Sequence, residues 1–171
     1  QKDIYADVVQ GVNGENERFV ELGNLVFMQY ERQQSGDLKP LAQTHVDTGS
    51  GLERLCAMAQ GVDTNYETDL FRPILSAVEN LSGIKYEPGE AGTPHRVIAD
   101  HLRMLSFAIA DGVTPGNEGR GYVLRRVLRR ASRFSQHLNQ DKPFIYRFVP
   151  ELVNIMGAAF PELKERQTYV E

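Results

Sequence analysis

The sequence changes character at residues 46–55, Val-Asp-Thr-Gly-Ser-Gly-Leu-Glu-Arg-Leu. Before Gly49 the chain is rich in β-branched and aromatic residues, which favour strands. After Gly51 apolar residues recur at helical spacing until Gly61, namely Leu52, Leu55, Cys56 and Ala59. The sequence therefore predicts a strand that passes through two glycines directly into a short helix.

The segment before this junction predicts an antiparallel hairpin. Residues 18–30 have the composition of a strand that is broken or bulged near Gly23, and residues 41–47 that of a second strand. Between them, Ser35-Gly36-Asp37 is a turn signal.

The remainder of the chain predicts helices, at residues 67–82, 95–111, 121–138, 144–157 and 161–171. Residues 87–93, with one proline and two glycines, are the best candidate linker, and residues 111–121 are a Gly/Pro-rich loop. We therefore expect an α+β, mostly α chain, with a short antiparallel β end in residues 1–60 and a bundle-like helical region in residues 61–171.

The two ends of the chain differ in charge. Residues 1–92 hold 7 Lys/Arg and 15 Asp/Glu, a net charge of −8, whereas residues 93–171 hold 12 and 8, a net charge of +4. This asymmetry points to an interaction surface, although a chance imbalance in solvated faces explains it as well.

Composition excludes several classes of protein. No run is long enough to span a membrane, and no signal peptide is visible at the start. Because Cys56 is the single cysteine, an internal disulfide and a cysteine-rich zinc site are ruled out, which is consistent with the reducing cytoplasm. We expect Cys56 to be a buried structural thiol. The histidines show no metal-ligand spacing, so no metal site is expected. Because the chain begins at Gln1, we expect a piece of a longer protein.

Residues 46–55 are the first candidate site. Two glycines allow close approach to the backbone, and the following helix N-terminus favours an anion. Arg54 can offer a planar fork to a phosphate, while Asp47 is placed for an ammonium group. These features suit a zwitterion and a polyphosphate. A glycine turn with an Asp/Thr helix cap and a surface Glu–Arg pair fits the same spacing.

The same residues resemble motif 3 of the class II aminoacyl-tRNA synthetases, in the Val-Asp-Thr-Gly-x-Gly-Leu-Glu-Arg form typical of alanyl-tRNA synthetases. Residues 18–32 are similar to a strand of that family, and residues 96–131 are similar to a signature stretch in its helical domain. The three matches occur in family order. The resemblance implies that residues 1–60 end a class II catalytic core and that residues 61–171 begin a tRNA-recognition region.

The resemblance also implies roles for individual residues. Arg54 would bind the γ-phosphate of ATP, and Gly49 and Gly51 would leave room for the nucleotide and the adenylate. Asp47 would hold the α-amino group of alanine, beside Gly49, and Asn24 would contact the alanine carboxylate or its carbonyl. Arg54 and Asp47 would be the catalytic residues.

Two positions depart from the family pattern: Gly23 replaces a usual tryptophan, and Ser50 replaces a usual methionine.

The reaction that the resemblance implies has two steps. The alanine carboxylate attacks the α-phosphorus of ATP, with Mg²⁺, and the terminal ribose hydroxyl of tRNA(Ala) then takes the alanyl group. Such chemistry depends mainly on positioning and charge neutralisation.

The predicted helix at 121–138 is the second candidate site. Its apolar residues form one face, and five arginines without an intervening acid fall on an opposite arc of roughly 140°. These arginines, the basic stripe, are Arg125, Arg126, Arg129, Arg130 and Arg133. They suit RNA phosphates, although a solvated face paired with acids of the first half is the alternative.

The loop before this helix contains Asn117 and Arg120. An asparagine amide can donate and accept, and it can therefore read base edges in the shallow minor groove of duplex RNA. The resemblance places at Asn117 a residue that helps to recognise the G·U wobble pair of the tRNA(Ala) acceptor stem, with Arg120 as a backbone contact. An ordinary turn asparagine is the alternative.

The expected function is therefore part of an alanine–tRNA ligase in the cytoplasm, with alanine, tRNA(Ala) and the remainder of the same polypeptide as partners and no membrane. No stretch matches the family's motifs 1 and 2, and its editing domain and zinc site would lie downstream. We accordingly expect the chain alone to be inactive. The alternative is a helical RNA-binding module without catalysis.

Overall fold

The computed structural model describes residues 19–171, and the chain divides into two compact units between Thr64 and Asn65. Helices make up most of the secondary structure, and the sheet found among the described residues has two antiparallel strands. The predicted α+β, mostly α class is confirmed. The predicted start of the first strand, at Arg18, lies outside the described residues.

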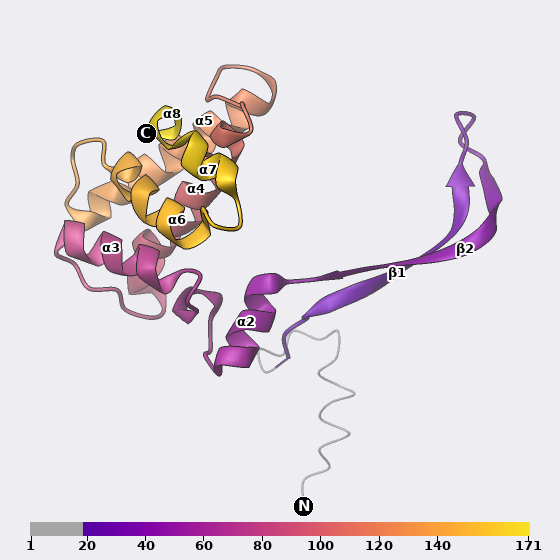
Figure 1. The fold of residues 1–171 in the computed structure, drawn as a ribbon, viewed down its shortest axis with the longest axis horizontal. Coiled ribbons are helices and arrows are strands. Elements are labelled where there is room, and N and C mark those ends of the chain that lie inside the picture. Colours follow the sequence, from indigo (N-terminus) through magenta and orange to yellow (C-terminus); the bar gives the residue numbers. More distant parts are fainter. Residues whose placement is uncertain (1–18) are drawn as a thin grey trace, which may run out of the picture. The chain divides into compact units, whose positions relative to one another are not determined.

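The first unit contains a long hairpin and one helix (Figure 1). Strand β1 (Gly23–Arg32) pairs with β2 (Leu38–Ser50), and helix α2 (Leu52–Gln60) follows. At the turn, the backbone N–H of Gln33 donates to the carbonyl of Asp37 at 2.9 Å, and Gly36 has a φ of 93°. The predicted hairpin is thus present, but β2 is longer at both ends than residues 41–47.

The irregularity expected near Gly23 lies elsewhere. The register shifts between the pair Met28 and His45 and the pair Tyr30 and Pro40, so β2 carries the extra residues. Proline has no N–H to give to a ladder and commonly marks such a bulge. Gly23 instead begins β1, and its lack of a side chain has a steric reason: a Cβ there would lie 2.5 Å from the carbonyl oxygen of Gly49.

Helix α2 ends where the sequence indicates. Gly61 adopts the left-handed conformation (φ 66°, ψ 33°), and its N–H reaches the last carbonyls of the helix. Cys56 is half-buried rather than buried, and the buried residue of α2 is its neighbour Ala57. The expectation of a buried thiol is therefore wrong.

Both faces of the hairpin expose large apolar side chains. Leu25 and Phe27 are 61% and 68% exposed, and Val26 on the opposite face is 51% exposed. An isolated two-stranded hairpin is at best marginally stable in water. Contiguous exposed apolar surface of this kind marks an interface.

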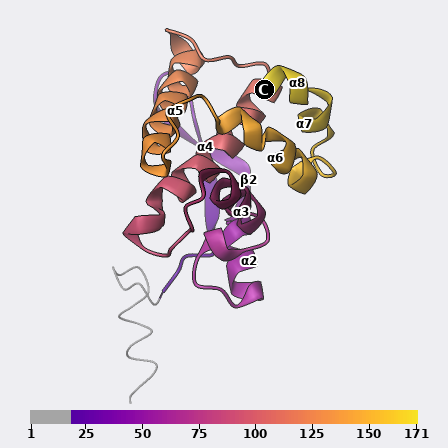
Figure 2. The same ribbon diagram turned by 90° about the vertical axis from the view of Figure 1, so that its left-hand side faces the viewer.

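The second unit is helical (Figure 2). Its α-helices are α3 (Arg72–Ser82), α4 (Thr93–Ala110), α5 (Gly119–Ser135), α6 (Val149–Met156), α7 (Pro161–Glu165) and α8 (Gln167–Val170). Short 3₁₀ helices are η1 (Asn65–Glu67), η2 (Glu90–Gly92), η3 (Gln136–Leu138) and η4 (Ile145–Phe148). The predicted helices are present, but several are divided. The one expected from residue 67 begins at Arg72, where Pro73 occupies the first turn.

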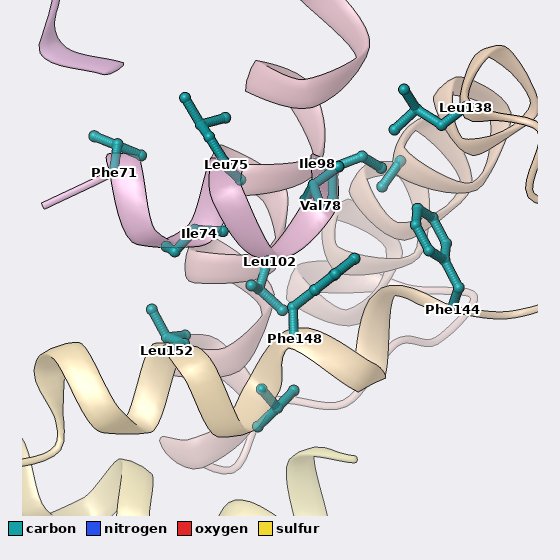
Figure 3. Close-up of a cluster of buried hydrophobic side chains, with 13 residues drawn as sticks. Phe71, Ile74, Leu75, Val78, Ile98, Leu102, Leu138, Phe144, Phe148 and Leu152 are labelled. Carbon is teal, nitrogen blue, oxygen red and sulfur yellow. The ribbon is translucent and has the colours of Figure 1, made fainter. Parts of the chain in front are cut away.

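Helix α4 is the centre of this unit, and it packs against α3, α5, α6, α7 and α8. Its buried face recurs at helical spacing through Ile98, Leu102 and Leu105. Figure 3 shows this core, in which α3 and α4 meet side chains of the C-terminal segments. The members labelled there are Phe71, Ile74, Leu75, Val78, Ile98, Leu102, Leu138, Phe144, Phe148 and Leu152.

Residues 87–93, predicted as a linker, lie inside the second unit. They comprise a turn, then η2 and the first residue of α4. Gly92 is buried, and a side chain there would collide with the carbonyl of Glu87 and the ring of Tyr86. The segment is therefore packed, and the prediction of a linker is wrong.

A buried carboxylate anchors the chain just before this segment, at Tyr86. Glu79 of α3 accepts a hydrogen bond of 2.8 Å from the backbone N–H of Tyr86 and pairs with Arg72 at 3.1 Å. Burial alone would raise the pKa of Glu79, but the Tyr86 hydrogen bond and the Arg72 charge outweigh it, so the pKa lies below its ordinary value. Glu79 is thus an ionised anchor for the chain after α3.

A second polar contact joins η1 to α4. The hydroxyl of Tyr66 donates to Asp100 at 2.5 Å, and the guanidinium of Arg96 lies 5.6 Å from the Tyr66 ring centroid. Burial and the hydrogen bond to Asp100 raise the pKa of Tyr66 to about 12.

Among residues 19–171, no helix combines the length and the apolar character that crossing a membrane requires.

Candidate functional site

The hairpin register brings three predicted site residues onto one face. Asn24 lies opposite Gly49, and Val26 lies opposite Asp47. Directly opposite residues of an antiparallel pair share a face, as do alternate residues along each strand. Asn24, Asp47 and Gly49 therefore line the same side of the hairpin.

Gly49 leaves open space on that face. A Cβ there would meet only the Oδ1 atom of Asn24, at 3.9 Å, which is ordinary contact. Nδ2 of Asn24 donates to the Glu21 carboxylate at 3.3 Å, and Oδ1 of Asp47 accepts from the N–H of Thr48 at 2.9 Å. A carboxylate can accept several hydrogen bonds, so Asp47 retains capacity for an ammonium group.

Arg54 lies in the first turn of α2 and contacts the start of the hairpin. Its Nη1 atom donates to the backbone carbonyl of Glu21 at 2.5 Å. A guanidinium has five N–H donors, so the others remain available to an anion. A Cβ at Gly51 would lie 3.3 Å from Cδ of Arg54, and part of the space that Gly51 leaves is therefore used by Arg54 itself.

The N-terminus of α2 has no side-chain cap. Gly51 is the N-cap residue, while Asp47 bonds to Thr48 and the Thr48 hydroxyl bonds to the carbonyl of Asn24 at 3.3 Å. The alternative of an Asp/Thr helix cap is therefore not observed in this segment. Uncapped N–H groups at a helix start, with the positive end of the helix dipole, favour an anion.

The basic stripe is exposed along α5. All five of its arginines are exposed, whereas Leu124 and Ala131 of the same helix are buried. Within residues 65–171, none of the five forms an ion pair with a carboxylate. The helix begins at Gly119, so Arg120 lies in its first turn rather than in the preceding loop, and it too is exposed.

Two of these arginines lie over aromatic rings of their own helix. The Arg126 guanidinium is 6.0 Å from the Tyr122 centroid, and that of Arg130 is 5.9 Å from the Phe134 centroid. Such contacts favour particular side-chain orientations.

The charge of the basic stripe also acts on His101 of α4. Burial lowers the pKa of His101, and the charge of Arg130 lowers it further against the opposing effect of Asp100.

Asn117 is exposed and bound to the stripe. Its Oδ1 atom accepts a hydrogen bond of 2.6 Å from Nη1 of Arg125. The loop is also fastened through its backbone, since the N–H of Gly116 donates to the carbonyl of Gly121 at 2.9 Å. Gly121 was not recognised from the sequence, although a glycine in the first helical turn after a Gly/Pro-rich loop is a signal of such close approach.

A cavity of about 430 Å³ lies elsewhere in the second unit, between α4, α5 and the segment after η3. Its walls include Leu102, Ile109, Ser135 and Phe144. None of the predicted site residues lines it. Among residues 19–171, no cluster of three or more His, Cys, Asp or Glu side chains could hold a metal ion.

Comparison with known proteins assigns a family. A family model described as class II (A) tRNA synthetases matches residues 2–171. The chain is 51% identical over 164 residues to the alanine–tRNA ligase of Chlorobium phaeovibrioides, covering 93% of this chain and 18% of that protein. It is 48% identical over 170 residues to the alanine–tRNA ligase of Neisseria gonorrhoeae, covering 99% of this chain and 19% of that protein.

A third relative, the alanine–tRNA ligase of Geobacillus kaustophilus, is 49% identical over 158 residues, which cover 92% of this chain and 18% of that protein. The chain thus spans less than one fifth of the length of these relatives.

Proposed function

The chain belongs to the class II (A) tRNA synthetase family, and on that premise we propose that it forms part of an alanine–tRNA ligase. The first unit would supply part of the alanine and ATP site, and the second unit would supply part of the tRNA-binding surface. The single observation that carries this proposal is the placement of Asn24, Asp47 and Gly49 on one face of the hairpin.

Alanine is a small zwitterion, and the hairpin face offers a partner for each of its charges. The Asp47 carboxylate would bind the ammonium group, and the Asn24 amide would bind the carboxylate through Nδ2. Gly49 adds no side chain between them, and a substrate therefore has room beside the backbone. A charge-assisted hydrogen bond to each end would fix the orientation of the substrate.

ATP would bind at the start of α2. The uncapped helix N-terminus supplies N–H donors, and Arg54 supplies further donors for the γ-phosphate. Mg²⁺ would accompany the phosphates of ATP. Its chemistry there would be neutralisation of phosphate charge.

The proposed reaction joins the two substrates in a fixed geometry. An oxygen of the alanine carboxylate attacks the α-phosphorus, and the bond to pyrophosphate breaks. The 3′-terminal ribose of the tRNA then takes the alanyl group, and AMP leaves. The residues of this chain act by holding and orienting the reactants, which is a large source of rate enhancement for such steps.

The rest of the catalytic machinery would come from the remainder of the polypeptide. The exposed apolar faces of the hairpin support this, since residues such as Leu25 and Phe27 need a covering partner. We accordingly propose that the chain alone forms no alanyl-adenylate. We also propose that the whole protein works in the cytoplasm.

The second unit would bind the acceptor stem of tRNA(Ala). The exposed arginines of α5 and Arg120 would contact phosphates, and Asn117 would read the G·U wobble pair in the minor groove. The absence of ion pairs to the basic stripe within residues 65–171 supports this proposal, because its charges remain available to RNA.

Titration calorimetry of the full-length protein with a non-hydrolysable alanyl-adenylate analogue tests the catalytic part. We expect Asp47→Asn and Arg54→Ala each to weaken binding, and Arg32→Ala to leave it unchanged. Arg32 is a suitable control because it lies at the far end of the same hairpin, with Nη1 on the carbonyl of Gly36 at 3.2 Å. Wild-type affinity in both site variants would favour an RNA-binding module without catalysis.

A further inference from the structure

The contact between Arg125 and Asn117 determines which group Asn117 presents to a ligand. A guanidinium has only donors, so the amide atom that faces it must be the oxygen. The reverse orientation would bring the amide NH₂ against Nη1 and place two donors together. The NH₂ group of Asn117 is therefore directed away from Arg125.

The backbone of the loop strengthens this arrangement. Gly116 is hydrogen-bonded to Gly121, and a Cβ at Gly121 would lie 2.7 Å from the carbonyl oxygen of Thr114. The loop thus lies directly on the first turn of α5, and Arg125 lies in the next turn of the same helix. Two contacts, one through the backbone and one through the side chain, hold Asn117 against the helix.

Asn117 also lies at the end of a surface that suits RNA. Arg125 and Arg129 are four residues apart on α5 and so lie about 40° apart around the helix. Both are exposed, as is Asn117. A duplex whose phosphates contact the basic stripe could therefore bring its groove to the Asn117 amide.

We propose that Arg125 is a positioning residue, which orients the Asn117 amide so that its NH₂ donates to a hydrogen-bond acceptor in the minor groove of duplex RNA. The acceptor would be a pyrimidine O2 or a purine N3, because the sideways displacement of the bases in a wobble pair changes where these atoms lie in the groove. This inference rests on the proposed tRNA-binding function and deepens it. An amide held in one orientation discriminates between groove edges, whereas a freely rotating amide can donate or accept.

The test compares two acceptor-stem duplexes in aminoacylation by the full-length protein, one with the wobble pair and one with a Watson–Crick pair. Arg125→Lys keeps the charge, but its ammonium ends about one bond short of the guanidinium nitrogens. We expect it to reduce the ratio of kcat/KM values between the duplexes about two- to tenfold, as for the loss of one hydrogen bond. The matched control, Arg129→Lys, should change both rates by the same factor.

Asn117→Ala separates the possible failures. If Asn117→Ala lowers the ratio but Arg125→Lys leaves it intact, the positioning role is refuted and the RNA-reading role of Asn117 stands. If Asn117→Ala itself leaves the ratio intact, the proposed reading role fails, and the inference fails with it. In the double variant, a ratio no lower than that of Asn117→Ala supports the inference, whereas additive losses contradict it.

Discussion

Arg54 and Glu21 are joined by a hydrogen bond of 2.5 Å, from Nη1 of the arginine to a backbone carbonyl 33 residues earlier. The contact ties the first turn of α2 to the start of the hairpin. It also orients the guanidinium beside the uncapped N-terminus of the helix. Arg54 thus has a structural contact and, with its remaining donors, a proposed role in binding ATP.

Substitution of Arg54 should therefore affect ATP more than alanine. In alanine-dependent pyrophosphate exchange by the full-length protein, we expect Arg54→Ala to lower kcat/KM for ATP by about tenfold or more, in line with the loss of a charged hydrogen bond. Arg54→Lys should lose less, because it keeps the charge. Arg32→Ala serves as the control, and an unaltered kcat/KM for ATP in Arg54→Ala would remove Arg54 from the nucleotide site.

Two glycines of the hairpin should respond differently to alanine. A methyl group at Gly49 meets only Asn24, at 3.9 Å, so Gly49→Ala should fold normally. It should nevertheless raise KM for alanine, because the methyl group enters the space proposed for the substrate. A methyl group at Gly23 would lie 2.5 Å from the Gly49 carbonyl, so Gly23→Ala should lower the melting temperature of the full-length protein.

The KM for alanine and the melting temperature, measured on both variants, decide this prediction. A normal KM in correctly folded Gly49→Ala would contradict the proposed position of the substrate. A wild-type melting temperature in Gly23→Ala would show that the strands separate easily at that position.

The buried carboxylate of Glu79 should make the stability of the second unit depend on pH. The pKa of Glu79 in the folded state lies below its ordinary value. The stabilisation that Glu79 gives the fold is therefore fully present above its unfolded pKa of about 4.3, and it is lost as pH falls through its folded pKa. We expect Glu79→Gln to cost about 1.5 kcal/mol at pH 7, the low end for charged hydrogen bonds, and to flatten the loss of stability below about pH 5.

Urea unfolding of the 171-residue chain between pH 3 and pH 7 measures this effect. Glu165→Gln is a suitable control, because Glu165 is exposed and its substitution should leave the curve close to that of the wild type. An equal acid sensitivity of Glu79→Gln and wild type would exclude Glu79 as the source.

Removal of charge from the basic stripe should weaken tRNA binding mainly at low salt. For Arg125→Ala combined with Arg129→Ala, we expect weaker binding to RNA of every sequence. In a plot of log K against log salt concentration, the slope should be smaller by about 2, because the variant no longer neutralises two phosphates. Filter binding or fluorescence anisotropy at several salt concentrations measures the slope. A slope equal to that of the wild type would place these arginines away from the RNA.

Local patterns were sufficient to predict the elements of the fold. Turn residues at 35–37 and the glycine at Gly61 marked the hairpin turn and the end of α2, because each acts through the backbone conformation of a few neighbouring residues. The exposed arc of arginines on α5 followed from helical periodicity alone. Element ends were less accurate: α3 begins at Arg72, with Pro73 in its first turn, rather than at residue 67.

The sequence by itself therefore determined the kinds of element, their order and the face on which the arginines lie. Only the tertiary structure decided that Asn24 lies opposite Gly49, that Arg54 bonds to Glu21, and that residues 87–93 pack into the second unit. It also decided that Arg125 bonds to Asn117. The physical reason is that strand register and side-chain partners depend on which groups meet in space, whereas periodicity and turn chemistry act within a few residues of the chain.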